Sequence, residues 1–285
     1  MALLSFYSLE DSSSDLTANA QTVWLANIRL HPIKGLDPAS VREARIGPNG
    51  GLELDRVWAL YSLDGNWVNG KRAPAIHLLR AEYDSAISSV TVSVSPGAAN
   101  PKKLQPAKFD FPSEFEHAAA WFTEYFGQQV IVRHVPQGAP DDDQATGPTV
   151  VSTASLQRVC ETFPGVSLIE ARERFRTTLE IDGVPAFWED QLFSPEENYP
   201  VRFKIGEVAF EGSNPCARCP VPPRNPRTGE EIVGFSRRFS DMRRTGLPPS
   251  SPAARFDHFY RLATNTRVAS SEQGKLLRLG DALVL

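Results

Sequence analysis

Two cysteines spaced as C-x-x-C give the clearest chemical signal in the sequence. Cys216 and Cys219 lie in the segment NPCARCPVPPRNPRTG, residues 214–229, with Arg218 between them and two more arginines downstream. Cationic neighbours favour the thiolate over the thiol, and the thiolate is the form that ligates metals. It is also the soft ligand that suits redox-active metals. The segment therefore predicts a proline-stiffened loop that presents a metal-binding thiolate.

Two other uses of a C-x-x-C pair fit this chain less well. A structural zinc site needs about four protein ligands, whereas this chain has one such pair, a third cysteine and five scattered histidines. A thioredoxin-type dithiol needs the pair at the start of a helix, which lowers the thiol pKa. Pro220, Pro222 and Pro223 oppose a helix there. The third cysteine, Cys160, follows a helical apolar pattern and is expected to be a small core residue.

Three cations occur in settings where charges are uncommon. Lys34 lies in the turn HPIKG after an expected strand, Arg56 lies in the expected apolar strand LDRVWAL, and Arg176 interrupts the strand-like apolar segment RFRTTL. A single lysine in a turn is usually solvated, and an arginine in a strand is often paired with a carboxylate such as Asp55. Together with the thiolate loop, however, the three cations predict a pocket for a dianionic ligand, because Lys and Arg bind phosphate strongly.

The first half of the chain should supply mostly strands to position these residues. Alternating apolar residues predict strands at 22–30, 54–63, 87–95 and 128–135. One helix is expected between the last two strands, with Ser113 as its N-cap and Glu116 completing a capping box. This half therefore predicts a mostly antiparallel β domain over residues 22–135.

A segment rich in Pro, Gly and Asp at 135–148 is the expected domain boundary. The elements expected beyond it are a helix at 150–163, strands at 199–212 and 275–285, and a long irregular segment at 221–254. The second domain should cover residues 146–285. The fold class expected for the whole chain is α+β and mostly β, with helices at the periphery.

Composition excludes several classes of protein. The 285 residues are 41% hydrophobic and 22% charged, as in ordinary globular proteins. The net charge of −4 disfavours a nucleic-acid-binding surface, and no apolar run of about 18 residues predicts a membrane span. Residues 1–21 resemble neither a secretory signal nor a mitochondrial presequence, so we expect a flexible tail. An odd number of cysteines suggests a reducing compartment, hence the cytoplasm, with mitochondrial association left open.

Several short motifs carry a family resemblance through their order and spacing. They are HPIKG, LDRVWAL with the stretch from Gly65 to Pro74, STASL, RFRTTL, CARC with PRTG, and the terminal GDALVL. In this order they resemble the MOSC superfamily, specifically proteins with an N-terminal MOSC β-barrel domain ahead of a MOSC β-barrel domain. Within it the chain is similar to the mitochondrial amidoxime-reducing component, from about Val23 to Leu285.

The resemblance implies a mononuclear molybdenum held by a pterin dithiolene and by one protein cysteine, the second of the C-x-R-C stretch, which is Cys219. It also implies side-chain contacts to the phosphate and pterin from Lys34, Arg56, Arg176 and Arg218, backbone contacts from Gly35 and Ala217, and a hydroxyl contact from Thr146. Two departures affect these expectations. Gly35 stands where close relatives often have Ser, and PRTG replaces a more acidic DPDTG, which leaves the substrate choice open.

The activity implied by the resemblance is two-electron reduction of small N-hydroxylated molecules by a molybdopterin cofactor. Electrons should come from a separate protein such as a cytochrome b5 or a ferredoxin-type protein. The chain has no G-x-G-x-x-G between a strand and a helix and too few cysteines for a [2Fe–2S] cluster. One alternative is a cofactor carrier or persulfide-transfer protein acting through Cys219, and its relation to sulfurases implies pyridoxal phosphate binding. The other alternative is a binding module with a vestigial site.

Overall fold

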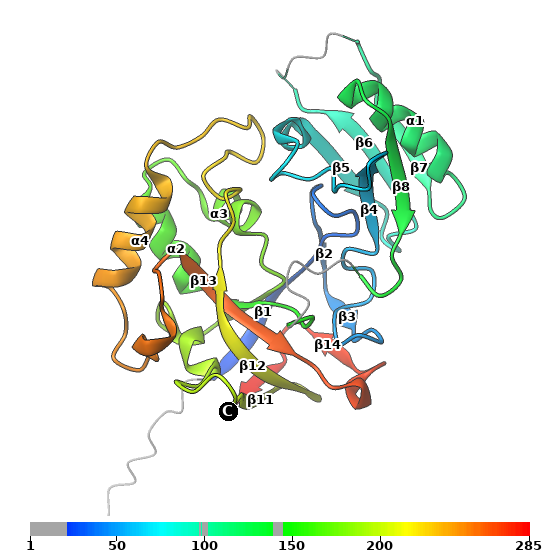
Figure 1. Ribbon diagram of the computed structural model, residues 1–285. Helices are drawn as coiled ribbons and strands as arrows, with labels where there is room; N and C mark the ends of the chain where they lie inside the picture. The colour runs from blue at the N-terminus through cyan, green and yellow to red at the C-terminus, as the bar shows by residue number, and fades with distance from the viewer. Residues whose placement is uncertain (1–21, 97, 99–101, 139–144) are drawn as a thin grey trace, which may run out of the picture.

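The computed structural model describes residues 22–96, 98, 102–138 and 145–285 (Figure 1). The expected N-terminal tail, 1–21, lies outside the described residues, and so does the middle of the expected boundary segment. The fold class is confirmed, since the described residues form a mostly β structure with a barrel, smaller sheets and four α-helices. None of these helices is long and apolar enough to cross a membrane.

A closed barrel of seven strands forms the centre of the second half. Its strand order is β10-β9-β13-β12-β11-β15-β1, and β1 pairs with β10 to close the ring. The strands are β1 (Val23–Leu30), β9 (Val150–Ser152), β10 (Leu179–Asp182), β11 (Val201–Ile205), β12 (Val208–Ala217), β13 (Arg261–Arg267) and β15 (Ala282–Val284). Neighbours are antiparallel except β9 and β10, which are parallel. Leu25, Ile28, Leu179 and Ile181 are fully buried in its core.

Strand pairing crosses the boundary that the sequence predicts. β1 comes from the first half of the chain, yet its partners β10 and β15 come from the second. β2 (Ala39–Val41) extends the sheet beside β1, and β3 (Glu43–Arg45) pairs with β14 (Leu276–Arg278). Without β1 the barrel would have two open edges, so a long-range pairing completes it. The domain ranges 22–135 and 146–285 stay a prediction from the sequence.

The rest of the first half forms two small sheets and a helix, at the upper right of Figure 1. These elements are β4 (Trp58–Ser62) paired with β8 (Val130–His134), β5 (Leu79–Tyr83), β6 (Ser89–Val94) and β7 (Ala107–Asp110) in one sheet, the short helix η1 (Pro74–Leu78), and α1 (Phe115–Phe126). Ala118 and Phe122 of α1 are buried, as its apolar spacing predicts. The predicted capping box is wrong, because the N-cap is Glu114 and Ser113 instead donates to the carbonyl of Asp110.

Three helices pack on one side of the barrel around an aromatic cluster. They are α2 (Thr153–Thr162), α3 (Leu168–Phe175) and α4 (Phe235–Thr245); the short helices η2 (Trp188–Leu192), η3 (Ala253–Arg255) and η4 (Ser270–Glu272) complete the elements. Phe163 and Phe235 stack with ring centroids 4.1 Å apart, and Phe175 and Phe239 join them. The expectation that 221–254 is irregular is therefore wrong in part, since α4 lies within it. The buried residues Phe235, Phe239 and Met242 of α4 have helical spacing. The five polar residues between them, two of which are arginines, obscure that pattern in the sequence.

Candidate functional site

All eight residues predicted for the site line one cavity of about 590 Å³. They are Lys34, Gly35, Arg56, Thr146, Arg176, Ala217, Arg218 and Cys219. The first three come from the first half of the chain and the others from the second, so both halves form the cavity wall. The structure brings these residues together, and their roles toward a cofactor stay predictions.

The charge of the cavity wall is one-sided. Six cationic side chains line the cavity, and the described part of the lining contains no carboxylate. The six are Lys34, Arg56, Lys71, Arg174, Arg176 and Arg218. A cleft lined by charges of one sign concentrates the field and attracts a ligand of opposite sign. The cavity is therefore suited to an anion.

The turn after β1 holds Lys34 against the cavity. The backbone N–H of Lys34 donates to the carbonyl of Trp58 at 2.8 Å, and its ammonium lies 4.5 Å from the ring centroid of Trp67. Gly35 follows with a φ of 99°, and a Cβ there would come within 2.8 Å of Ile76 Cδ1. Glycine at this position therefore fits the local backbone and leaves room for Ile76.

Arg56 lies in a turn, which corrects the expectation of a strand. Its φ is 55°, in the left-handed region, and its backbone N–H donates to the carbonyl of His31 at 2.9 Å. Its guanidinium lies 3.1 Å from the carboxylate of Asp55, which also accepts the backbone N–H of His31 at 2.7 Å. Although burial raises the pKa of Asp55, Arg56 and His31 together hold it below its usual value. The strand β4 begins only at Trp58, after this strained turn.

Arg176 also departs from the expected strand, because it is the C-cap of α3. Its φ is 50°, and its backbone N–H donates to the carbonyl of Arg172 at 2.9 Å. Glycine is the usual residue in a left-handed helix cap, and another residue there costs about 1–2 kcal/mol. Two of the cavity arginines, Arg56 and Arg176, thus have a strained backbone. Strain of this kind concentrates at functional sites.

The thiol loop leaves the barrel at the end of β12. The backbone N–H of Arg218 donates to the carbonyl of Tyr260 at 3.0 Å, and one of its guanidinium nitrogens lies 3.1 Å from Cys216 Sγ. The same guanidinium bonds the carbonyl of Phe175 at the end of α3. Cys216 and Cys219 are both partly buried and line the cavity. Arg218 therefore connects the loop, α3 and the cavity wall.

Two histidines near the cations are uncharged at neutral pH. Burial and the nearby Arg176 guanidinium lower the pKa of His31 to about 3. The same two causes lower the pKa of His77 to about 4, and His77 lines the cavity. Neutral imidazoles among the arginines add no further positive repulsion, so the cation set can remain assembled.

The donor set fits a metal that brings most of its own ligands. In the described ranges, no three or more His, Cys, Asp or Glu residues gather to hold a metal ion. Cys219 could supply one soft sulfur ligand, and a pterin dithiolene would supply others. The cation-lined wall suits the phosphate of such a group. The residues present therefore fit a molybdopterin cofactor.

Sequence reasoning missed seven polar residues of the cavity wall, namely Asn69, Lys71, His77, Thr149, Arg174, Asn214 and Asn265. Asn214 and Asn265 are direct partners across β12 and β13. The alternation of β12 could have indicated Asn214, because it lies two residues before Cys216 on the same strand. Nothing local marks the other six, which the tertiary structure brings to the cavity.

Comparison with known proteins identifies both halves of the sequence. The model of the MOSC N-terminal beta barrel domain matches residues 22–129, and that of the MOSC domain matches residues 144–283. The molybdenum cofactor sulfurase of Drosophila mojavensis is 24% identical over 259 residues, which is 82% of this chain and 31% of that protein. That of Danio rerio is 22% identical over 242 residues, which is 73% of this chain and 29% of that protein. This chain thus spans less than a third of these relatives.

One solved structure aligns along most of the chain. The YUAD protein from Bacillus subtilis covers 92% of this chain and 94% of its own, with 10% identity and a TM-score of 0.36.

Proposed function

The chain is a MOSC domain protein with a MOSC N-terminal beta barrel domain, and from this premise we propose that it is a molybdenum-cofactor enzyme that reduces small N-hydroxylated molecules. One observation carries the proposal: a partly buried thiol and six cations line a single cavity whose described lining has no carboxylate. The similarity to molybdenum cofactor sulfurases supports the cofactor, and the resemblance to the amidoxime-reducing component supports the substrate class.

The proposed roles follow the chemistry of each residue. Cys219 is the single protein ligand to molybdenum. The phosphate and pterin are bound by Lys34, Arg56, Arg176 and Arg218, and Gly35 and Ala217 offer backbone contacts. Thr146 offers its hydroxyl oxygen as an acceptor, because its hydroxyl hydrogen is already donated to the carbonyl of Asn49. When bound, the cofactor would supply the two-electron redox chemistry.

The residues of the chain itself are proposed to bind and orient the cofactor. The ion pair with Asp55 restricts the Arg56 guanidinium, and the left-handed backbone fixes the direction in which the side chain leaves the turn. His31 and His77 stay neutral through the physiological pH range, so these two imidazoles add no charge beside the cavity cations there.

The experiment that tests this function is elemental analysis of protein produced in a host that makes the cofactor. We expect close to one molybdenum per chain, and Cys219→Ser should lose both metal and N-hydroxylated-substrate reduction while staying folded. Cys216→Ser is the matched control and should be milder. Cys160→Ser should affect mainly stability, by about 1–3 kcal/mol, because it places a hydroxyl among apolar side chains. Full turnover by Cys219→Ser would refute the assignment.

The proposal also includes a separate electron donor, such as a cytochrome b5 or a ferredoxin-type protein. Purified chain should turn over with dithionite or a supplied partner, and salt should weaken the partner-dependent rate because charged patches guide such contacts. Steady NAD(P)H oxidation by the chain alone would contradict this part.

A second candidate is a cofactor carrier or persulfide-transfer protein, which the similarity to molybdenum cofactor sulfurases favours. Cys219 would then carry a sulfane sulfur, and purified protein would hold persulfide without retained molybdenum. Cyanide-releasable sulfur measured beside the metal content separates the two functions. Pyridoxal phosphate binding stays a prediction from the sulfurase relatives.

A further inference from the structure

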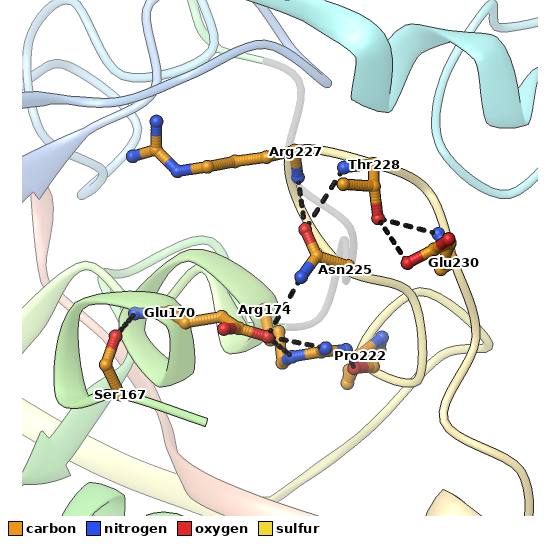
Figure 2. A network of polar contacts seen from close by, with 8 residues as sticks. All are labelled: Ser167, Glu170, Arg174, Pro222, Asn225, Arg227, Thr228 and Glu230. Carbon is orange, nitrogen blue, oxygen red and sulfur yellow. Dashed lines mark hydrogen bonds and ion pairs between the residues drawn. The ribbon is translucent and has the colours of Figure 1, made fainter. Parts of the chain in front are cut away.

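The loop that follows Cys219 is fastened to α3 by a network of polar contacts (Figure 2). Arg174 projects from the last turn of α3 and donates to the carbonyl of Pro222 at 2.8 Å. It also makes two bonds to one carboxylate oxygen of Glu170, at 2.8 and 2.6 Å. Asn225 donates its side-chain amide to the same oxygen at 3.3 Å. We call Glu170, Arg174, Asn225 and the carbonyl of Pro222 the clasp.

The ion pair of the clasp is largely shielded from solvent. The Arg174 side chain is 2% exposed and the Glu170 side chain is 21% exposed. Hydrogen bonds to charged partners are stronger than neutral ones, and a buried charge left without its partner is costly. The clasp should therefore hold the loop in one position.

The loop itself sets the orientation of Asn225. Its side-chain oxygen accepts the backbone N–H groups of Arg227 and Thr228 at 2.8 and 3.1 Å, as in an Asx turn. The amide nitrogen is left to face Glu170, as Figure 2 shows. An aspartate here would keep the turn but place a carboxylate oxygen against the carboxylate of Glu170. Asparagine is therefore matched to its partner on α3.

A second contact of the loop also goes to α3. Arg227 lies 2.9 Å from the carboxylate of Glu173, one helical turn from Glu170. Asn225 and Arg227 are the two positions where this chain departs from the acidic DPDTG pattern, and neither lines the cavity. The departure thus serves the attachment of the loop to α3, with Glu170 and Glu173 as the complementary partners.

The clasp joins the two chemical parts of the cavity. Pro222 is three residues after Cys219, and Arg174 is two residues before Arg176. We propose that Arg174 is a positioning residue, which with Glu170 and Asn225 fixes the Cys219 thiol relative to the cavity arginines. The inference rests on the proposed function only for what the thiol binds.

The test follows the thiol in the metal-free chain. Iodoacetamide modification is measured peptide by peptide, so that Cys160 serves as an internal control in each sample. The isosteric Asn225→Asp should free the loop and raise the Cys219 alkylation rate about tenfold, the effect of losing one charged hydrogen bond. Arg174→Met should give at least the same increase. Arg238→Met, which removes an arginine that bonds the carbonyl of Thr162 away from the loop, should give none.

An internal comparison distinguishes positioning from general loosening. Cys160 alkylation should stay at its wild-type rate in Asn225→Asp and in Arg174→Met, because Cys160 lies on α2 and not on the loop. Unchanged Cys219 reactivity in Asn225→Asp, or an equal rise at Cys160, would overturn the proposal.

Metal analysis separates the clasp from the proposed function. If wild-type protein retains molybdenum, Asn225→Asp should lower its molybdenum content, and Arg238→Met should leave it unchanged. If wild-type protein holds no molybdenum, the proposed function fails, while the alkylation result still decides whether the clasp positions Cys219.

Discussion

Two charged regions of this molecule are built in opposite ways. In the cavity, six cations face a common space, and the described lining provides no carboxylate. Between η2 and α4, Arg243 is 1% exposed and donates to both carboxylate oxygens of Asp190, at 3.0 and 2.9 Å. The Arg243 guanidinium also lies 4.0 Å from the ring centroid of Phe187. The first region keeps its cations at a space open to a ligand even where, as at Arg56 and Arg174, a carboxylate outside the lining pairs with the cation, whereas the second has charges arranged for each other.

The contrast teaches how to separate structural from functional charge in this chain. Removing a charge whose partner is a buried protein group leaves that partner unsatisfied, so the cost falls on folding. Removing a charge that also faces the cavity takes away a contact to the ligand, so ligand binding must weaken whatever the cost to folding.

Arg243→Leu should lower the free energy of unfolding by about 3–5 kcal/mol, because it leaves Asp190 buried without its ion pair. Urea denaturation at pH 7 measures the change. Arg238→Leu is the matched control on the same helix, since its side chain is exposed and contacts the carbonyl of Thr162 and the ring of Phe163 rather than a buried carboxylate. A loss below 1 kcal/mol for Arg243→Leu would contradict the structural role of this region.

Glu189→Gln should remove a pH-dependent weakness of the same region. Burial and the neighbouring Asp190 raise the pKa of Glu189 from 4.5 to about 7, although the hydrogen bond from Ser155 lowers it in part. The folded state therefore holds a proton that the unfolded state releases, and stability falls as pH rises from about 4.5 to about 7. The variant should gain on the order of 3 kcal/mol relative to wild type by pH 8 and little at pH 4.5.

Urea denaturation of wild type and Glu189→Gln from pH 4.5 to 8 measures the difference in their free energies of unfolding. The opposite contribution of His31 and His77 is the same in both proteins and cancels in this difference. Those histidines have lowered pKa values and make both chains less stable in acid. A constant difference between the two chains from pH 4.5 to 8 would show that Glu189 does not titrate as stated.

Charge removal in the cavity should act on the cofactor. Lys34→Met, Arg56→Met and Arg176→Met should each weaken cofactor binding about tenfold or more, the effect of one charged hydrogen bond. Arg56→Met should also lower the unfolding midpoint of the metal-free chain, because it leaves the buried Asp55 carboxylate without its ion pair. Molybdenum per chain after dilution and gel filtration reports occupancy. The rate per bound molybdenum should stay near wild type. Unchanged occupancy with a lower rate would show that these residues act on the reaction itself.

The smallest effect concerns backbone strain at Arg176. Because its φ is 50°, Arg176→Gly should make the metal-free chain more stable than Arg176→Ala by about 0.5–1 kcal/mol, since only glycine adopts this conformation without cost. Both variants should lose cofactor equally. Equal urea midpoints for the two variants would show that the cavity arginine carries no strain.

Local chemistry was readable from the sequence alone. The alternation in Val23–Leu30 predicts β1 because one face of that strand is buried, and a period of two needs no distant partner. The prolines after Cys219 predict a loop without a helix, because proline limits the backbone wherever it occurs. The residue types of Lys34, Arg56, Arg176 and the thiol loop also indicated an anion pocket with one thiolate, whereas Gly35, Ala217 and Thr146 came from the family resemblance.

Only the tertiary structure decided how these parts combine. β1 closes a barrel whose other strands come from the second half, which no local period indicates. Arg56 and Arg176 were expected in strands, but both have left-handed backbones. The apolar residues after Arg56 form β4, and Phe175 before Arg176 packs in the aromatic cluster around α3. Arg174 was not expected in the site at all. Its part depends on Pro222 and Asn225, about fifty residues away, and such long-range contacts form only when the whole chain packs.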